Sequence, residues 1–257
     1  MIKQPQTIAI DLIDKINDQF SQIQLYQDKN SFAIKQLDAQ SSKLIQADAE
    51  AGWYAKGMIA SLCGDMDQAR YAFKNASQLG NPDAAKDHWM ISAINLGYFS
   101  EAVTLYEEIG APTKGRFTEL ASKGFSYGAF ETLKRFLDEA KVMELDLSGL
   151  GVDGFNKVIA LLEKDGTTQQ DAMRLLDAAG EVLRSRKAFF VGSGPHFFIE
   201  SSEYGDSGCA HFQYEVPLSP NEASEMNFEL AEKIAAMPER IPNAFCVSFI
   251  SSNANYS

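Results

Sequence analysis

Long apolar runs are missing from this chain of 257 residues. No stretch of about 18 apolar residues occurs, so the sequence predicts no transmembrane helix. The first residues, from Met1 to Pro5, do not place a cationic stretch before an apolar one, and we expect no secretory signal. Hydrophobic residues still make up 45% of the chain, which is enough for a buried core. These features predict a globular protein that does not contact a membrane.

Cysteine is also scarce. The chain contains three cysteines, Cys63, Cys209 and Cys246, which are odd in number and far apart in the sequence. A disulfide framework needs an even set of closely spaced cysteines in a small secreted chain. The cysteine content therefore predicts a reducing compartment, and we expect a cytoplasmic protein.

Positively charged residues are also few: the chain has 23 Lys and Arg and 35 Asp and Glu, which gives a net charge of −12. A nucleic-acid binder needs clustered cations, so we expect proteins, peptides or small molecules as partners. Residues 187–257 contain three basic and nine acidic residues, which is half of the net charge. Acidic residues of this kind usually form a solvent-exposed surface. The alternative interpretation is that they attract a basic protein partner electrostatically.

Proline is rare over most of the chain and frequent at its end. Between Pro5 and Pro195 only Pro82 and Pro112 occur, whereas the last 63 residues contain five prolines. Proline breaks helix interiors, and the phenylalanines that crowd the tail favour strands. The sequence therefore predicts a mixed, mainly α fold, with a helical repeat domain over residues 1–186 and a small acidic α+β domain over residues 187–257.

A repeated pattern runs through the helical part. Three segments share a Gly, an Ala five residues later and a large apolar residue four further on. A glycine readily ends a helix, a small alanine lets two helices approach, and the large side chain fills the gap between them. The pattern predicts three helix–turn–helix units. Their residues are Gly64, Ala69 and Phe73; Gly97, Ala102 and Tyr106; and Gly124, Ala129 and Leu133.

The first unit resembles a tetratricopeptide repeat. Trp53, Gly57, Ala69 and Phe73 match that pattern in type and spacing, although Lys56, Ala60 and Pro82 depart from it. With the two weaker units, the resemblance covers about residues 48–142. It implies an α-solenoid that holds a protein or peptide in a groove lined by the first helix of each pair. An ordinary helical bundle is the alternative.

The resemblance also implies which residues face the groove. They are apolar apart from one carboxylate, which suits an amphipathic helix or an extended hydrophobic segment. Members of the family that bind C-terminal carboxylates use Lys and Asn where Tyr54 and Met58 stand here, so that activity is not implied. The predicted groove residues are Tyr54, Met58, Ser61 and Leu62 in the best repeat, and Asp87, Ile91, Ile94 and Asn95 in the next.

The tail has a different pattern. Residues 209–216 alternate between polar and apolar side chains, which is typical of a half-buried strand, and residues 196–200 form a plausible preceding strand. Ser219-Pro220-Asn221-Glu222 is a strong helix start, and residues 245–249 alternate again. The tail therefore predicts a ββαβ unit. Between it and the repeats we expect two more helices, the second opening with a capping box of Thr167 and Gln170.

The polar faces of the two predicted strands offer the one candidate for chemistry. His196 and Glu200 share a face of the first strand, and Cys209, His211, Gln213 and Glu215 share a face of the second. Such a set could supply a Cys nucleophile with a His base, or metal ligands. The simpler interpretation is a solvated sheet face, with Cys246 a small buried residue. We therefore expect no catalytic residues, no metal and no cofactor.

The sequence thus predicts a non-enzymatic adaptor. It would bind a protein or peptide through the repeat groove, the acidic C-terminal domain, or both. A narrower form is a neutralising partner of a basic toxin or effector, and self-association is compatible with either. The alternative is a hydrolase or metal-dependent enzyme that uses the Cys and His residues of the C-terminal domain.

Overall fold

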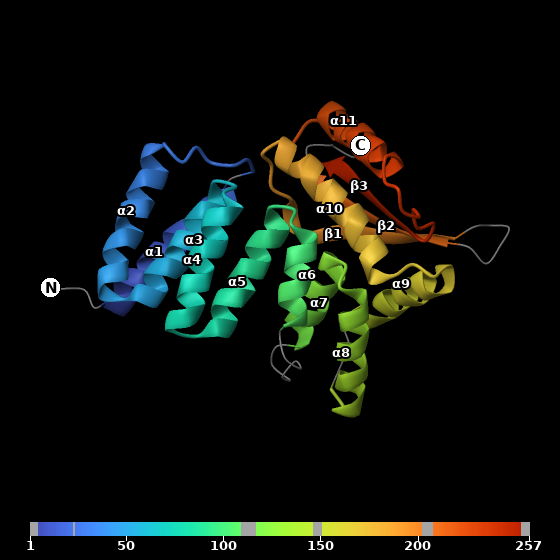
Figure 1. Cartoon of the computed structure of the whole chain (residues 1–257), viewed down its shortest axis with the longest axis horizontal. Coiled ribbons are helices and arrows are strands. Elements are labelled where there is room, and N and C mark those ends of the chain that lie inside the picture. Colours follow the sequence, from blue (N-terminus) through green and yellow to red (C-terminus); the bar gives the residue numbers. More distant parts are fainter. Residues whose placement is uncertain (1–4, 23, 109–116, 146–150, 202–207, 253–257) are drawn as a thin grey trace. The chain divides into compact units, whose positions relative to one another are not determined.

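The computed structural model describes residues 5–22, 24–108, 117–145, 151–201 and 208–252 (Figure 1). These residues form eleven helices and three strands, which confirms a mainly helical fold with a small sheet near the C-terminus. None of the described helices is both long and apolar enough to cross a membrane. The elements are α1 (Pro5–Gln22), α2 (Phe32–Ala47), α3 (Ala49–Leu62), α4 (Met66–Leu79), α5 (Pro82–Asn95), α6 (Phe99–Glu107), α7 (Phe117–Tyr127), α8 (Phe130–Val142), α9 (Val152–Asp165), α10 (Gln169–Ser185), β1 (Val191–Ser201), β2 (Gly208–Val216), α11 (Pro220–Ala235) and β3 (Phe245–Ser251).

The contacts divide the chain into two compact units. The first unit contains residues 1–96 with 186–189, and the second contains residues 97–185 with 190–257. Helices α6 to α10 therefore belong to the same compact unit as the sheet, although their composition groups them with the preceding helices.

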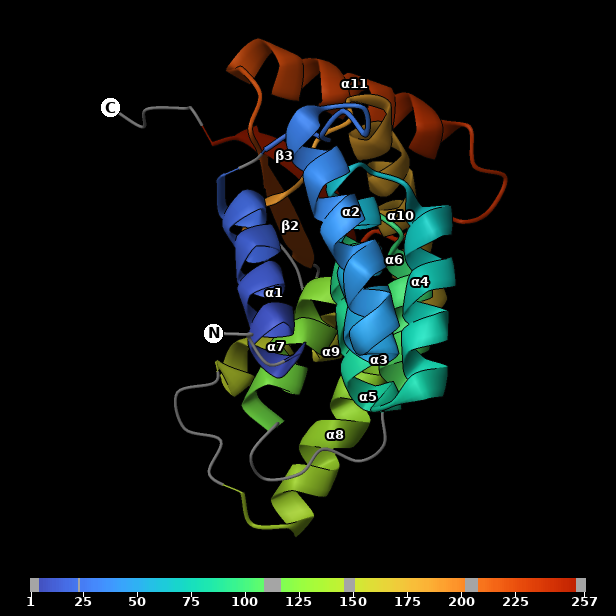
Figure 2. The ribbon, with the colours of Figure 1, turned by 90° about the vertical axis from the view of Figure 1, so that its left-hand side faces the viewer.

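The first unit is a run of antiparallel helices in which α2, α3, α4 and α5 each pack against the next (Figure 2). Each of these helices begins at a residue whose side chain accepts a hydrogen bond from its first turn: Ser31, Asp48, Asp65 and Asn81. Such caps stabilise helix starts by about 1 kcal/mol each, which explains why the helices break at these positions.

A short segment that follows α10 returns to this unit. The backbone N–H of Tyr26 donates to the carbonyl of Lys187 at 2.8 Å, and the N–H of Phe189 donates to the carbonyl of Gln24 at 3.0 Å. The ring of Phe189 packs against the rings of Phe20 and Tyr26.

Two of the three predicted turn glycines are in turns. Gly64 and Gly97 both have a φ of 71°, the left-handed conformation that favours glycine after a helix. The prediction for Gly124 was wrong, because the third turn glycine is Gly128, one helical turn later, with a φ of 80°. Gly124 lies inside α7, where an added Cβ would be 2.6 Å from the ring of Tyr106. A Gly in the sequence thus marks either a turn or a close ring contact.

The residues that carry the tetratricopeptide pattern form one packed set between α3 and α4. Ala69 and Phe73 are fully buried, and a Cβ at Gly57 would lie 2.6 Å from the ring of Phe73. Trp53 is half-buried and contacts the edge of Tyr71 at 5.5 Å between ring centroids. A small residue on one helix therefore accommodates the large ring of its neighbour, as the spacing predicts.

The predicted ββαβ order is confirmed in the second unit. The sheet has the order β1-β2-β3, with β1 antiparallel and β3 parallel to β2. Ser219 and Glu222 form the predicted capping box of α11. At α10 the reciprocal pair is Thr168 with Asp171, one residue after the predicted Thr167 and Gln170.

One face of the sheet is buried. On this face the ring of Phe212 contacts the rings of Phe125 from α7 and Phe130 from α8. The hydroxyl of Tyr214 donates a hydrogen bond to the carbonyl of Ser126 at 2.9 Å. The free edge of β3 is covered by α11, because the Asn227 amide bonds both backbone groups of Phe249. The buried side chains are Ala210, Phe212, Tyr214 and Val216 of β2, and Phe245, Val247 and Phe249 of β3. The alternate residues of the strands lie on the opposite, partly exposed face.

Candidate functional site

The predicted groove residues lie on α3 and α5, and the structure places them in two groups. Met58, Ser61 and Leu62 are at most 4% exposed and belong to the core of the first unit. The remaining residues are half-buried and keep surface that a partner can reach: Tyr54, Asp87, Ile91, Ile94 and Asn95. Only the second group can contact a partner without a rearrangement of the helices.

Tyr54 connects the two helices of this surface. Its ring meets the edge of His88 on α5, with 4.6 Å between the ring centroids. Burial raises the pKa of the Tyr54 hydroxyl well above its usual range, and the negative charge of Asp87 raises it further. The tyrosine therefore stays neutral, and the surface is mainly apolar, with the carboxylate of Asp87 and the amide of Asn95 as its polar groups.

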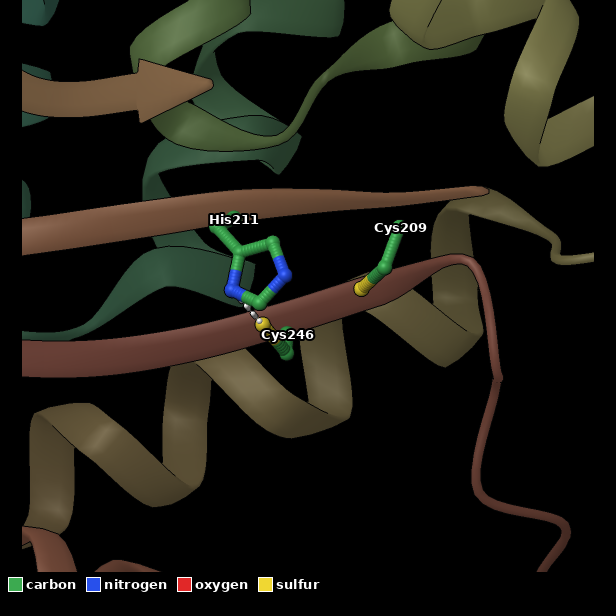
Figure 3. Close-up of side chains that lie close together, drawn as sticks. All are labelled: Cys209, His211 and Cys246. Atoms are coloured by element: carbon green, nitrogen blue, oxygen red, sulfur yellow. Dashed lines mark hydrogen bonds between the residues drawn. The ribbon is translucent and has the colours of Figure 1, made fainter. Parts of the chain in front are cut away.

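A second candidate site lies on the open face of the sheet. Side chains alternate along β2, so Cys209 and His211 share this face, and the parallel register places Cys246 of β3 opposite His211. One donor atom from each of the three residues lies within 4.8 Å of the others (Figure 3). The Nδ1 of His211 faces the Sγ of Cys246 at 2.8 Å. We call these three residues the Cys–His cluster.

Two residues of β1 hold the imidazole of His211. The ring of Phe198 stacks on it almost in parallel, at 4.7 Å between centroids. The Oε2 atom of Glu200 lies 3.0 Å from the Nε2 of His211, without the alignment of a hydrogen bond. The imidazole thus has its Nδ1 towards Cys246 and its Nε2 towards a carboxylate.

The sequence anticipated part of this arrangement. Cys209, His211 and Glu200 come together as their alternation suggests. His196 does not join them, because its Nε2 lies 2.7 Å from the Oε1 of Glu215 further along the strands. Cys246 was missed, because we interpreted it as a buried residue, whereas its side chain is half-buried on the open face. Its place between the buried Phe245 and Val247 was the available signal, because neighbours in a strand point to opposite faces.

The two thiols of the cluster differ in acidity. The neighbouring Cys246 thiol lowers the pKa of the Cys209 thiol, because an S–H group beside a thiolate can donate to it. The same pairing of the two thiols, together with burial, raises the pKa of Cys246. Away from the cluster, burial and nearby carboxylates raise the pKa of Cys63 to about 11.

These shifts predict the order of alkylation of the metal-free, reduced protein. The thiolate is the reactive form, so Cys209 should react with iodoacetamide faster at neutral pH than Cys63 or Cys246. Mass spectrometry of the labelled peptides over time measures all three rates in one sample. Equal rates at Cys209 and Cys63 would contradict the effect of Cys246 on the Cys209 thiol. A Cys209 rate no higher than that of free cysteine would also remove the idea of a nucleophile.

Comparison with known proteins adds no identification. No protein-family model, no curated protein and no solved structure matches this chain.

Proposed function

We propose that this chain is a non-enzymatic adaptor that binds a protein or peptide through the exposed part of α3 and α5. The observation that carries the proposal is the partly exposed set of Tyr54, Ile91 and Ile94, with Asp87 as the charged group. A partner that buries such a surface gains about 25 cal/mol for each square ångström of apolar area. We call this set, with Asn95, the α3/α5 surface.

The repeat pattern supports this proposal. The Gly57–Phe73 contact and the turn glycines Gly64 and Gly97 follow the spacing of tetratricopeptide repeats. We propose that the helix pairs form a TPR-like solenoid, a scaffold that binds partners through the first helix of each pair. An amphipathic helix or an extended hydrophobic segment fits the apolar character of the α3/α5 surface.

The charge of the chain supports a basic partner. Half of the net charge of −12 lies in residues 187–257, so a cationic protein would be attracted to this region before it docks. The narrower proposal is a neutralising partner of a basic toxin or effector in the cytoplasm. All three cysteines are free thiols, which is consistent with a reducing compartment.

The experiment that tests the adaptor proposal is partner capture from the native host, with Tyr54→Ser/Ile91→Ser as the variant. We expect the wild-type chain to retain a partner that the double variant loses, because the variant removes the largest apolar contacts of the α3/α5 surface. Met58 stays unchanged, because it is 4% exposed and its replacement would disturb the core.

The matched control is Tyr71→Ser/Leu79→Ser on the neighbouring helix α4. Tyr71 is 57% exposed and Leu79 is 54% exposed, so both are large apolar side chains outside the proposed surface. The control should capture the partner as the wild type does. If both double variants retain the partner equally, with unchanged circular dichroism, the α3/α5 surface is not the binding site.

The alternative function, an enzyme that uses the sheet face, is favoured by the Cys–His cluster. Cys209, whose thiol has the lowered pKa, would be the nucleophile. His211, with a donor nitrogen within 4.8 Å and Glu200 beside its Nε2, would be the base. The alkylation rates described above test the nucleophile form of this alternative.

A further inference from the structure

The Cys–His cluster has the composition of a site for a soft divalent metal. Two sulfur atoms and one imidazole nitrogen from Cys209, Cys246 and His211 are the donors that zinc prefers in proteins. From the geometry we infer that these three residues bind one zinc ion on the open face of the sheet. The inference does not depend on the α3/α5 surface, which lies in the other unit.

The distances within the cluster suit a zinc ion. Bonds of about 2.3 Å to sulfur and 2.0 Å to nitrogen in a tetrahedron place the donor atoms about 3.5–3.8 Å apart. In the cluster, the Nδ1 of His211 and the Sγ of Cys246 are 2.8 Å apart, and one donor atom from each residue lies within 4.8 Å of the others. Shifts of about 1 Å, within the reach of side-chain rotation, therefore create the site.

The surroundings of His211 also match a metal ligand. A histidine that binds metal through one nitrogen commonly presents its other nitrogen to a carboxylate, which fixes the ring. Here Nδ1 faces the sulfur of Cys246 while Nε2 lies 3.0 Å from Glu200, and Phe198 stacks on the ring. Glu200 is therefore a positioning residue of the proposed site.

The charge balance favours a divalent cation. Zinc binding displaces the protons of Cys209 and Cys246 to solvent, and the two thiolates neutralise the ion. Among the residues that the structure describes, the cluster supplies three ligand atoms, one from each of Cys209, His211 and Cys246. Three protein ligands leave the fourth position to a water molecule, because Cys209, His211 and Cys246 are all partly exposed. The sequence raised Cys209 and His211 as possible metal ligands but did not include Cys246, which lies 37 residues after Cys209 with no short cysteine motif to connect them.

The test is zinc binding by the full-length chain, reduced and freed of metal. Equilibrium dialysis with zinc alone should give one ion per chain. Titration with cobalt(II) should give the thiolate-to-metal absorption of a tetrahedral site. Cys209→Ser and Cys246→Ser should each lose both signals, whereas Cys63→Ser, the matched control outside the cluster, should keep them.

Glu200→Gln provides a second variant that leaves the ligands in place. The side chain of Glu200 is 71% exposed, so its replacement should not unfold the sheet. Zinc affinity should fall about tenfold, as is typical when a carboxylate partner of a metal-bound histidine is lost. The proposal is overturned if the reduced wild type binds no zinc. It is equally overturned if Cys246→Ser, with the melting temperature of the metal-free wild type, binds zinc as tightly as the wild type.

Discussion

Replacement of Phe212 by alanine is expected to destabilise the second unit by about 3–5 kcal/mol, the usual cost for a buried phenylalanine. Phe212 lies at the centre of β2 and has no exposed surface. Its ring centroid is 5.0 Å from that of Phe245 and 5.1 Å from that of Phe125. Because rings from a strand and from a helix surround it, little of the cavity can collapse.

The matched control is Phe228→Ala on α11. Phe228 is 72% exposed, so the same change of side chain should cost less than about 0.5 kcal/mol. Denaturant unfolding measures both variants, and hydrogen exchange at the amides of β2 assigns the loss to the sheet. A loss below about 1 kcal/mol for Phe212→Ala would show that these rings do not form the core of the unit.

Gly180→Ala should also destabilise the second unit, although alanine is the better helix former by about 1 kcal/mol. Gly180 lies inside α10, where an added Cβ would be 2.7 Å from the carbonyl carbon of Gly97 and 3.0 Å from its Cα. These neighbours are backbone atoms that cannot rotate away. Overpacking costs about 1–3 kcal/mol, and the rigid contact points to the upper end, so we expect a net loss of about 2 kcal/mol.

Gly154→Ala in α9 separates this contact from helix propensity. A Cβ at Gly154 would meet only the ring end of Phe197, at 3.2 Å, and this side chain is 39% exposed, so a shift of a few tenths of an ångström relieves the contact. This variant should be neutral or more stable by up to about 1 kcal/mol. Thermal unfolding compares the two, and a Gly180→Ala protein as stable as Gly154→Ala would contradict the close approach of α10 to Gly97.

The periodic parts of the fold could be predicted because their signals are local. The alternation along β2 and the Ser219–Glu222 capping box each depend on a few neighbouring residues, and both are confirmed. The third turn could not be placed, because the sequence offers two glycines, Gly124 and Gly128, and nothing near them shows which one ends the helix. Gly124 lies inside α7, because a side chain there would clash with the ring of Tyr106, 18 residues earlier in the chain. The hydroxyl of Tyr106 donates a hydrogen bond to the carbonyl of Leu120.

The candidate sites show the same limit. The sequence brings Cys209 and His211 together, because they are two residues apart on one strand. It does not reveal Cys246, which is far away in the sequence. Cys246 lies opposite His211 only because β3 pairs in parallel with β2 in this particular register. On the repeat helices, spacing selects the faces of α3 and α5. Only packing shows that Met58 and Leu62 are fully buried while Tyr54 keeps part of its surface exposed.

The affinity of the captured partner for the purified chain tests the adaptor proposal most directly. Calorimetry should show binding by the wild type and by Tyr71→Ser/Leu79→Ser with equal affinity. Binding by Tyr54→Ser/Ile91→Ser should be at least tenfold weaker, which corresponds to about 1.4 kcal/mol of lost binding free energy. Equal affinity in all three proteins, each with an unchanged unfolding temperature, would contradict the account.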